Sequence, residues 1–253
     1  MQRQERLARP AGLWSALQFL TRLPVRSTAF GMPVALVWFP AVGLILGGLL
    51  TLADLGLRWL GVAPLLDSVL LVVLWLLLTG ALHADGLADT CDAVFCHATP
   101  ERRLEIMRDP HVGAFGVVGL VSVLLVKVAA IDGLAPAMRT GSLVLAPILG
   151  RWAILLLATI FPYGRPDGLG APLKLAATPR ALAVASVLPA IACGALWPSG
   201  ATLGALAAVA AWLLGWWLMR LLPGLTGDSY GATCEIVEAL VLVAAGPLAR
   251  LGM

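Results

Sequence analysis

Charge is scarce in this sequence. Only 12% of its 253 residues are charged, whereas about 25% is usual in soluble domains, and 60% are apolar. The mean hydropathy is +0.94. No polar segment is long enough for a separate soluble domain, so we expect one membrane-embedded catalytic domain over residues 1–253. The net charge of +3 is too small to indicate nucleic-acid binding. These features predict an integral membrane protein.

Cysteine is also scarce, and its spacing indicates no disulfide framework. We expect free thiols at Cys91, Cys96, Cys193 and Cys234. The spacing of Cys91 and Cys96 with His97 is not a usual zinc spacing, which argues against zinc. The basic N-terminus is not followed by a short apolar stretch with a small-residue cleavage site, so we expect no cleaved signal peptide.

The apolar runs predict an all-α, polytopic membrane bundle of six or seven transmembrane helices. Residues 11–20 predict a short amphipathic helix at the membrane interface, within an N-terminal cytoplasmic or interfacial segment of residues 1–33. The apolar runs lie at roughly 34–52, 67–82, 112–131, 142–161, 181–197, 201–222 and 235–249.

The basic residues predict the orientation. With seven spans and a cytoplasmic N-terminus, twelve of the 17 Lys and Arg residues lie inside and three outside. We therefore expect a multi-pass inner-membrane protein in which residues 83–111 and 223–234 form cytoplasmic active-site loops. Lys127 and Arg151 fall within spans. Lys127 is expected to snorkel outward, whereas Arg151 either reaches the cytoplasmic site or pairs with an acid.

Three aspartates follow the second apolar run at turn spacing. Asp85, Asp89 and Asp92 occupy positions i, i+4 and i+7, and Gly86 allows close approach to the backbone. On a helix the three carboxylates share one face. Hard oxygen ligands suit Mg²⁺ or Mn²⁺, and such ions usually carry phosphate substrates. The alternative is a solvated helix face.

Two further segments carry candidate residues. In Glu101–Asp109, arginines can grip phosphate oxygens or serve only as cytoplasmic surface charge. In Pro223–Ala232, a glycine-rich turn leads into the last helix, with Asp228 as a plausible N-cap and exposed amides as an anion site. Asp228, Glu235 and Glu238 provide a second carboxylate group, although a plain capped loop explains the same pattern.

Together these motifs resemble the cobalamin synthase family, the adenosylcobinamide-GDP ribazoletransferases. The resemblance rests on Phe19–Pro24, His83–Asp92, Arg102–Asp109, Gly113–Gly116, Gly150–Trp152 and Leu225–Ala232. It implies a Mg²⁺-dependent transfer in which an oxygen of α-ribazole, or of its 5′-phosphate, attacks adenosylcobinamide-GDP and releases GMP. The product is adenosylcobalamin or its 5′-phosphate. The expected partners are then these small molecules and membrane lipid, and whether the protein forms a homo-oligomer stays an open question.

The resemblance and the residue chemistry together assign candidate roles. One carboxylate, Asp92, or alternatively His83, accepts the proton of the attacking hydroxyl. The candidate catalytic residues are Asp92, His83 and Asp89; the candidate metal ligands are Asp85, Asp89, Asp92, Asp228 and Glu235; and the candidate substrate-binding residues are Arg102, Arg103, Arg108, Arg151, Gly86, Thr226 and Gly227.

Two rival interpretations remain at this point. A CDP-alcohol phosphotransferase also places an Asp-Gly-x-x-Ala motif on a membrane helix, but its later acidic spacing is absent here. A transporter uses intramembrane charges and broken helices, but its charges lie near the midplane, whereas most acids here are expected at one surface.

Overall fold

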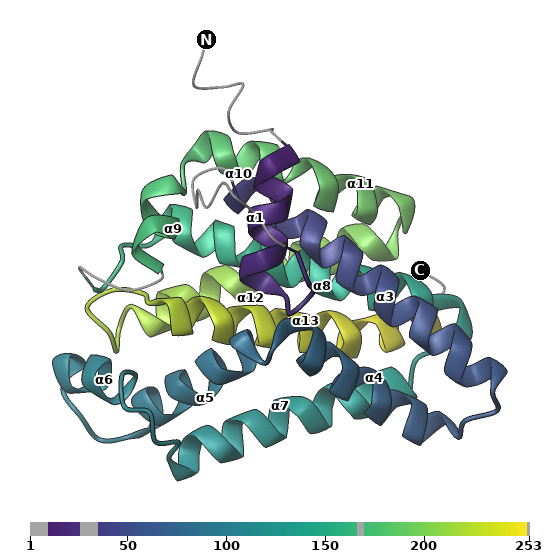
Figure 1. The fold of residues 1–253 in the computed structure, drawn as a ribbon, viewed down its shortest axis with the longest axis horizontal. Coiled ribbons are helices and arrows are strands. Elements are labelled where there is room, and N and C mark those ends of the chain that lie inside the picture. The colour runs from purple at the N-terminus through teal and green to yellow at the C-terminus, as the bar shows by residue number, and fades with distance from the viewer. Residues whose placement is uncertain (1–9, 26–34, 166–169, 252–253) are drawn as a thin grey trace.

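A computed structural model of the chain describes residues 10–25, 35–165 and 170–251. Every regular element in these ranges is a helix, which confirms the all-α prediction. The predicted N-terminal segment lies partly outside the described residues. The elements in chain order are α1 (Pro10–Leu20), η1 (Leu36–Trp38), α3 (Phe39–Trp59), α4 (Pro64–Thr79), α5 (Leu82–Phe95), α6 (Pro100–Ile106), α7 (Ala114–Asp132), α8 (Pro136–Ile160), α9 (Gly170–Ala176), α10 (Pro179–Ala185), α11 (Val187–Ala195), α12 (Ser199–Leu218) and α13 (Gly227–Arg250) (Figure 1).

Five stretches of helix are long and apolar enough to cross a membrane alone. Two bent helix pairs pass the same test together, so the described residues contain up to seven spans, in agreement with the predicted six or seven. The single spans are η1 with α3, α7, α8, α12 and α13; the pairs, each bent by 93°, are α4 with α5, and α9 with α10 and α11.

The bend between α4 and α5 comes from two successive residues with left-handed backbone. Gly80 ends α4 with a φ of 61°, and Ala81 follows with a φ of 56°. This conformation costs a non-glycine residue roughly 1–2 kcal/mol, so the packing around Ala81 must hold it. The chain then forms α5 and α6, so the segment 83–111, predicted as a cytoplasmic connection between spans, is mostly helical.

Helix α8 forms the centre of the bundle, with α3 and α13 packed along it. Small residues allow these contacts. A Cβ atom on Gly47 of α3 would come within 2.6 Å of the Val144 Cα atom, and one on Gly150 of α8 would come within 2.8 Å of the Glu238 Cγ atom. By contrast, α7 leaves most of its apolar side chains exposed, as expected for a lipid-facing helix.

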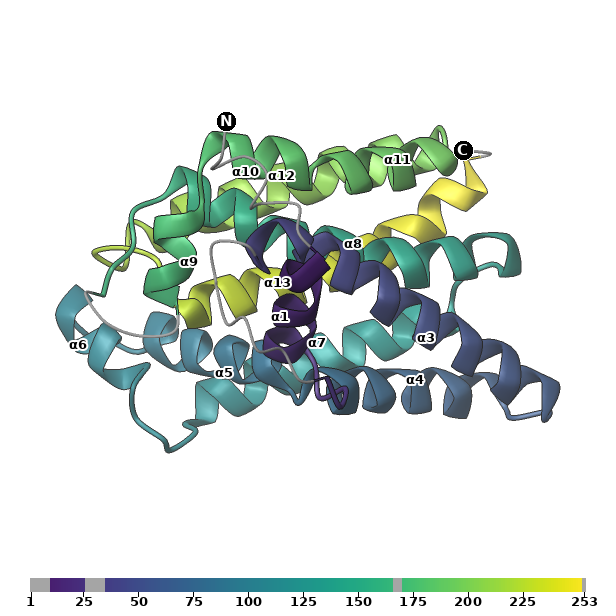
Figure 2. The ribbon, with the colours of Figure 1, turned by 45° about the horizontal axis from the view of Figure 1, so that its top comes forward.

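The predicted short helix at residues 11–20 is present as α1. It crosses the long helices instead of running along them (Figures 1 and 2). Ala16, Leu17 and Leu20 are buried against the protein, and Trp14 is half exposed. The helix therefore uses one face for protein packing. All four cysteines are free, as predicted.

The long helices give the bundle two distinct ends. One end gathers α6, the last turns of α5, α9 and the connection from α12 to α13 (Figure 2). The other end holds the turn from α3 to α4 and the connection from α7 to α8. The two acidic segments singled out from the sequence both lead toward the first end.

Candidate functional site

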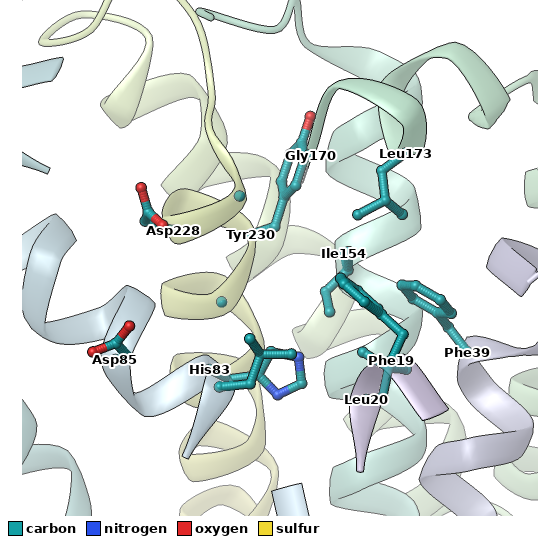
Figure 3. Close-up of a pocket in the computed structure, with 13 residues that line it drawn as sticks. Phe19, Leu20, Phe39, His83, Asp85, Ile154, Gly170, Leu173, Asp228 and Tyr230 are labelled. Carbon is teal, nitrogen blue, oxygen red and sulfur yellow. The ribbon is translucent and has the colours of Figure 1, made fainter. Parts of the chain in front are cut away.

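The two acidic segments meet where α5 crosses the start of α13. A Cβ atom on Gly86 would come within 2.9 Å of the Asp228 Cα atom, and one on Gly231 would come within 3.2 Å of the His83 Cα atom. The two backbones are therefore in direct contact. Asp85 and Asp228 flank this crossing on neighbouring helices (Figure 3). Gly86, predicted to allow close approach of a ligand, instead allows close approach of another helix.

The start of α13 is capped by Thr226, not by Asp228 as predicted. The Ser229 amide donates to the Thr226 hydroxyl at 3.2 Å, and the Thr226 amide donates to the Ser229 hydroxyl at 3.3 Å. This reciprocal capping satisfies the helix end. Asp228 therefore lies in the first turn of the helix, where the macrodipole favours a negative charge, and its carboxylate is not needed for capping.

Arg165 faces Asp228, a relationship that sequence reasoning missed. The Arg165 Nη1 atom is 3.0 Å from the Asp228 Oδ2 atom. Two loops bring the residues together: the Gly164 amide donates to the Leu225 carbonyl at 2.8 Å, and the Leu225 amide donates to the Pro162 carbonyl at 2.9 Å. Since this contact joins segments about 60 residues apart along the sequence, no local pattern signals it.

Two tyrosines lie beside this loop pair. The rings of Tyr163 and Tyr230 stack with centroids 6.3 Å apart. Burial raises the pKa of the Tyr163 phenol, so its hydroxyl stays protonated and can donate a hydrogen bond. The sequence contains only these two tyrosines, but no motif indicated that they would meet.

Three of the five predicted metal ligands gather at the crossing. Asp85 is exposed and Asp89 half-buried, and Asp89 lies within electrostatic range of both Asp85 and Asp228. Across the described ranges, no three His, Cys, Asp or Glu side chains are close enough together to hold a metal ion. The predicted five-ligand site is thus not preformed. Arg165 pairs with Asp228, and Asp85 and Asp89 add two carboxylates in electrostatic range of each other, so the oxygen donors at the crossing have a chemistry that suits Mg²⁺.

Asp92 joins the end of α5 to the start of α7. Its Oδ2 atom accepts a hydrogen bond from the Gly113 amide at 2.7 Å, and its Oδ1 atom accepts one from the Gly116 amide at 2.8 Å. These amides are at the start of α7, where orphan donors need acceptors. The carboxylate therefore fixes α7 to α5. The candidate roles of Asp92 as metal ligand and base stay predictions.

Glu235 belongs to a buried ionic network within the bundle. The Lys127 ammonium is 2.5 Å from the Glu235 carboxylate and also contacts Glu238. Glu238 in turn pairs with the fully buried Arg151, whose Nη2 atom is 3.4 Å from the His83 Nδ1 atom. The prediction of Lys127 as a snorkelling residue was wrong, because Lys127 is buried and pairs with Glu235 inside the protein. The role of Glu235 as a metal ligand stays a prediction. Of the two alternatives for Arg151, pairing with an acid is the one observed.

The three predicted phosphate-binding arginines after α5 differ in whether their guanidinium groups are free to contact a phosphate. Arg103 donates to the carbonyls of Ala93, Val94 and Ala98 near the end of α5, so it holds that helix end. Arg102 is exposed and pairs with Glu105 at 2.7 Å. Arg108 is exposed. Arg102 and Arg108 are therefore accessible to a phosphate, and the assignment of Arg103 to substrate stays a prediction.

A cavity of about 170 Å³ opens beside the crossing (Figure 3). Asp85, His83 and Asp228 form its polar side, and Gly227 lies on its wall. Its apolar side is formed by Phe19, Leu20, Phe39, Ile154 and Leu173, so residues from α1, α3, α8 and α9 complete a wall that the acidic motifs alone did not predict.

A second buried charge cluster lies at the opposite end of the bundle. The Arg139 Nε atom donates to Asp54 at 2.7 Å, and its Nη2 atom contacts Asp67. The Arg139 Nη1 atom donates to the Ile131 carbonyl at 2.6 Å. This cluster connects α3, α4 and α8. It is far along the bundle from the cavity, and its role is to join helices.

Comparison with known proteins places these features in one family. The family model described as cobalamin-5-phosphate synthase matches residues 12–246. The adenosylcobinamide-GDP ribazoletransferase of Stutzerimonas stutzeri (strain A1501) is 47% identical over 234 residues, covering 90% of this chain and 94% of the relative. The protein of the same name from Roseiflexus sp. (strain RS-1) is 40% identical over 242 residues, covering 92% of this chain and 88% of the relative.

No solved structure gives a significant match. The family model nevertheless covers most of the sequence, and the relatives match along most of their own length. The chain therefore belongs to the cobalamin-5-phosphate synthase family.

Proposed function

We propose that this chain joins adenosylcobinamide-GDP to α-ribazole, or to its 5′-phosphate, in the late assembly of cobalamin. A sugar hydroxyl of α-ribazole forms a new bond to the corrinoid-side phosphorus, and the bond from that phosphorus to GMP breaks. The hydroxyl proton passes to a base, and GMP leaves. Family membership favours this reaction over the CDP-alcohol phosphotransferase and transporter alternatives.

The observation that supports the chemistry best is that Asp85 and Asp228 line one cavity, with Asp89 in electrostatic range of both and Arg165 paired with Asp228. Phosphoryl transfer depends mainly on positioning and on neutralising phosphate charge. Asp85, Asp89 and Asp228 would hold Mg²⁺, which when bound offsets the charge of the diphosphate. Arg165 and the exposed Arg102 supply guanidinium groups for phosphate oxygens.

The proton acceptor is assigned to the Asp85 carboxylate oxygen that would not hold Mg²⁺. This carboxylate is exposed and also lines the cavity, so a bound hydroxyl can reach it. His83 is a weaker candidate because its Nδ1 atom faces the Arg151 guanidinium, and a nearby positive charge opposes formation of an imidazolium. Asp92 is occupied by the amides of α7.

The site end of the bundle is proposed to face the cytoplasm of a cell with an inner membrane. Arg102, Arg103, Arg108 and Arg165 gather around this end, and cytoplasmic loops carry an excess of Arg and Lys. Toward the opposite end lie Arg58, Arg139 and Arg250, of which Arg139 is neutralised by Asp54 and Asp67.

The reaction is tested with purified protein in liposomes supplied with adenosylcobinamide-GDP, α-ribazole and Mg²⁺. We expect GMP and adenosylcobalamin to appear in equal amounts. EDTA should stop both, and added Mg²⁺ should restore them. GMP release without a cobalamin product would contradict the transfer, and undiminished turnover in EDTA would contradict the role of Mg²⁺.

A further inference from the structure

We propose that the cavity beside the α5–α13 crossing binds the aromatic base of the acceptor nucleoside and holds its sugar toward Asp85 and Asp228. This inference rests on the proposed function, which names α-ribazole, a benzimidazole nucleoside, as acceptor. It adds which substrate occupies the cavity and which walls recognise it.

The apolar side of the cavity suits a flat ring with few polar edges. The rings of Phe19 and Phe39 stack with centroids 6.1 Å apart, and both line the cavity together with Leu20, Ile154 and Leu173. An apolar wall rewards burial of apolar ring surface, whereas a polar ring edge buried there loses its hydrogen bonds to water. The wall therefore favours a benzimidazole over guanine.

The size of the cavity also favours a single base. Pockets that enclose whole drug-sized ligands are about 300–1,000 Å³, and this cavity is about 170 Å³. It has room for one ring system, and neither a corrinoid nor a complete dinucleotide fits inside. The larger substrate must therefore remain outside, on the exposed side of Asp85.

The polar side fixes the direction in which a nucleoside enters. Asp85 and Asp228 are hydrogen-bond acceptors, which match the hydroxyl donors of a sugar. The same carboxylates repel a phosphate that arrives without a metal ion. An uncharged nucleoside with its base inward thus places a sugar hydroxyl at Asp85, the residue assigned to take its proton.

Gly227 offers a direct test because it lies on the cavity wall with open space before it. A Cβ atom there would have one backbone atom near it, the Gly170 nitrogen at 3.9 Å. Gly227→Leu should therefore fill the cavity without a backbone clash. Gly48→Leu is the matched control, since a Cβ atom on Gly48 meets nothing within 4 Å and the residue lies on α3 away from the cavity lining.

The experiment measures KM for each substrate and, separately, equilibrium binding of α-ribazole and guanosine by calorimetry. We expect Gly227→Leu to raise the KM and Kd for α-ribazole roughly tenfold or more, while the KM for adenosylcobinamide-GDP stays within about twofold. Gly48→Leu should match the wild type. Leu173→Asn, which makes the wall polar without filling it, should also weaken α-ribazole binding.

The outcomes separate this inference from the proposed function. Normal transfer by the wild type with unchanged α-ribazole binding in both cavity variants would overturn the cavity assignment alone. A rise confined to the KM for adenosylcobinamide-GDP, or tighter binding of guanosine than of α-ribazole, would also overturn it. If the wild type binds α-ribazole in the cavity but carries out no transfer, the proposed function is overturned while the assignment of the binding site stands.

Discussion

Gly86 in α5 lies against the backbone of Asp228 in α13, so closely that a Cβ atom on Gly86 would be 2.9 Å from the Asp228 Cα and carbonyl oxygen atoms. This contact sets the separation of the carboxylates that flank it. We expect Gly86→Ala to force the helices apart, to destabilise the protein by about 1–3 kcal/mol and to lower turnover. Gly56→Ala, at a position with open space, is the control. The measurements are the unfolding midpoint and the rate of GMP release. If Gly86→Ala matches Gly56→Ala in both, the close contact between α5 and α13 is contradicted.

Asp92 is expected to matter for stability more than for chemistry. Because it accepts hydrogen bonds from two amides at the start of α7, Asp92→Ala should destabilise the protein by about 1–2 kcal/mol. Asp92→Asn keeps one acceptor oxygen and should cost less. The measurements are the unfolding midpoint and turnover per folded molecule. Loss of all turnover in a fully stable Asp92→Asn variant would restore the interpretation of Asp92 as base.

The buried network gives a prediction about charge balance. Lys127→Met leaves Glu235 without a cation, while Glu238 keeps its pair with Arg151, and breaking a buried ion pair from one side costs about 3–5 kcal/mol. The double variant Lys127→Met with Glu235→Gln removes the unpaired charge and should recover part of that loss. A double-mutant cycle on unfolding free energies measures the coupling. If the changes in unfolding free energy of the two single variants simply add up in the double variant, the Lys127–Glu235 pair is contradicted.

The orientation can be tested by labelling single cysteines in a cysteine-free background. His97 is exposed at the site end, and Leu60 is exposed at the opposite end. A membrane-impermeant maleimide added to intact spheroplasts should label Leu60→Cys at once. It should label His97→Cys only after the membrane is permeabilised. The reverse pattern would place the site outside the cytoplasm.

Features with local causes were predictable from the sequence. The apolar runs gave the long spans, and the turn spacing of Asp85 and Asp89 gave a carboxylate face on a helix that the structure contains. The break after α4 was predictable only in part. Glycine commonly follows the end of a helix, as Gly80 does, but an alanine such as Ala81 gives no sign in the sequence of a left-handed backbone.

The partners of individual carboxylates were not predictable, because they come from distant parts of the chain. Asp92 finds its amide donors 21 and 24 residues away, and Glu235 finds Lys127 108 residues away. Such pairings depend on which helices pack together, whereas periodicity reports only which residues share one face. For the same reason, the pairing of Arg165 with Asp228 and the apolar wall of the cavity were not predicted.

The central claim is that the carboxylates at the α5–α13 crossing carry out the transfer, and Asp85→Asn tests it most directly. Asn keeps the size of the side chain but can neither hold Mg²⁺ as a charged ligand nor accept the proton. GMP release should fall roughly 100-fold or more, with an unchanged unfolding midpoint. Asp132→Asn, at an exposed aspartate at the other end of α7, should keep wild-type turnover. Wild-type turnover in a folded Asp85→Asn variant would contradict the account.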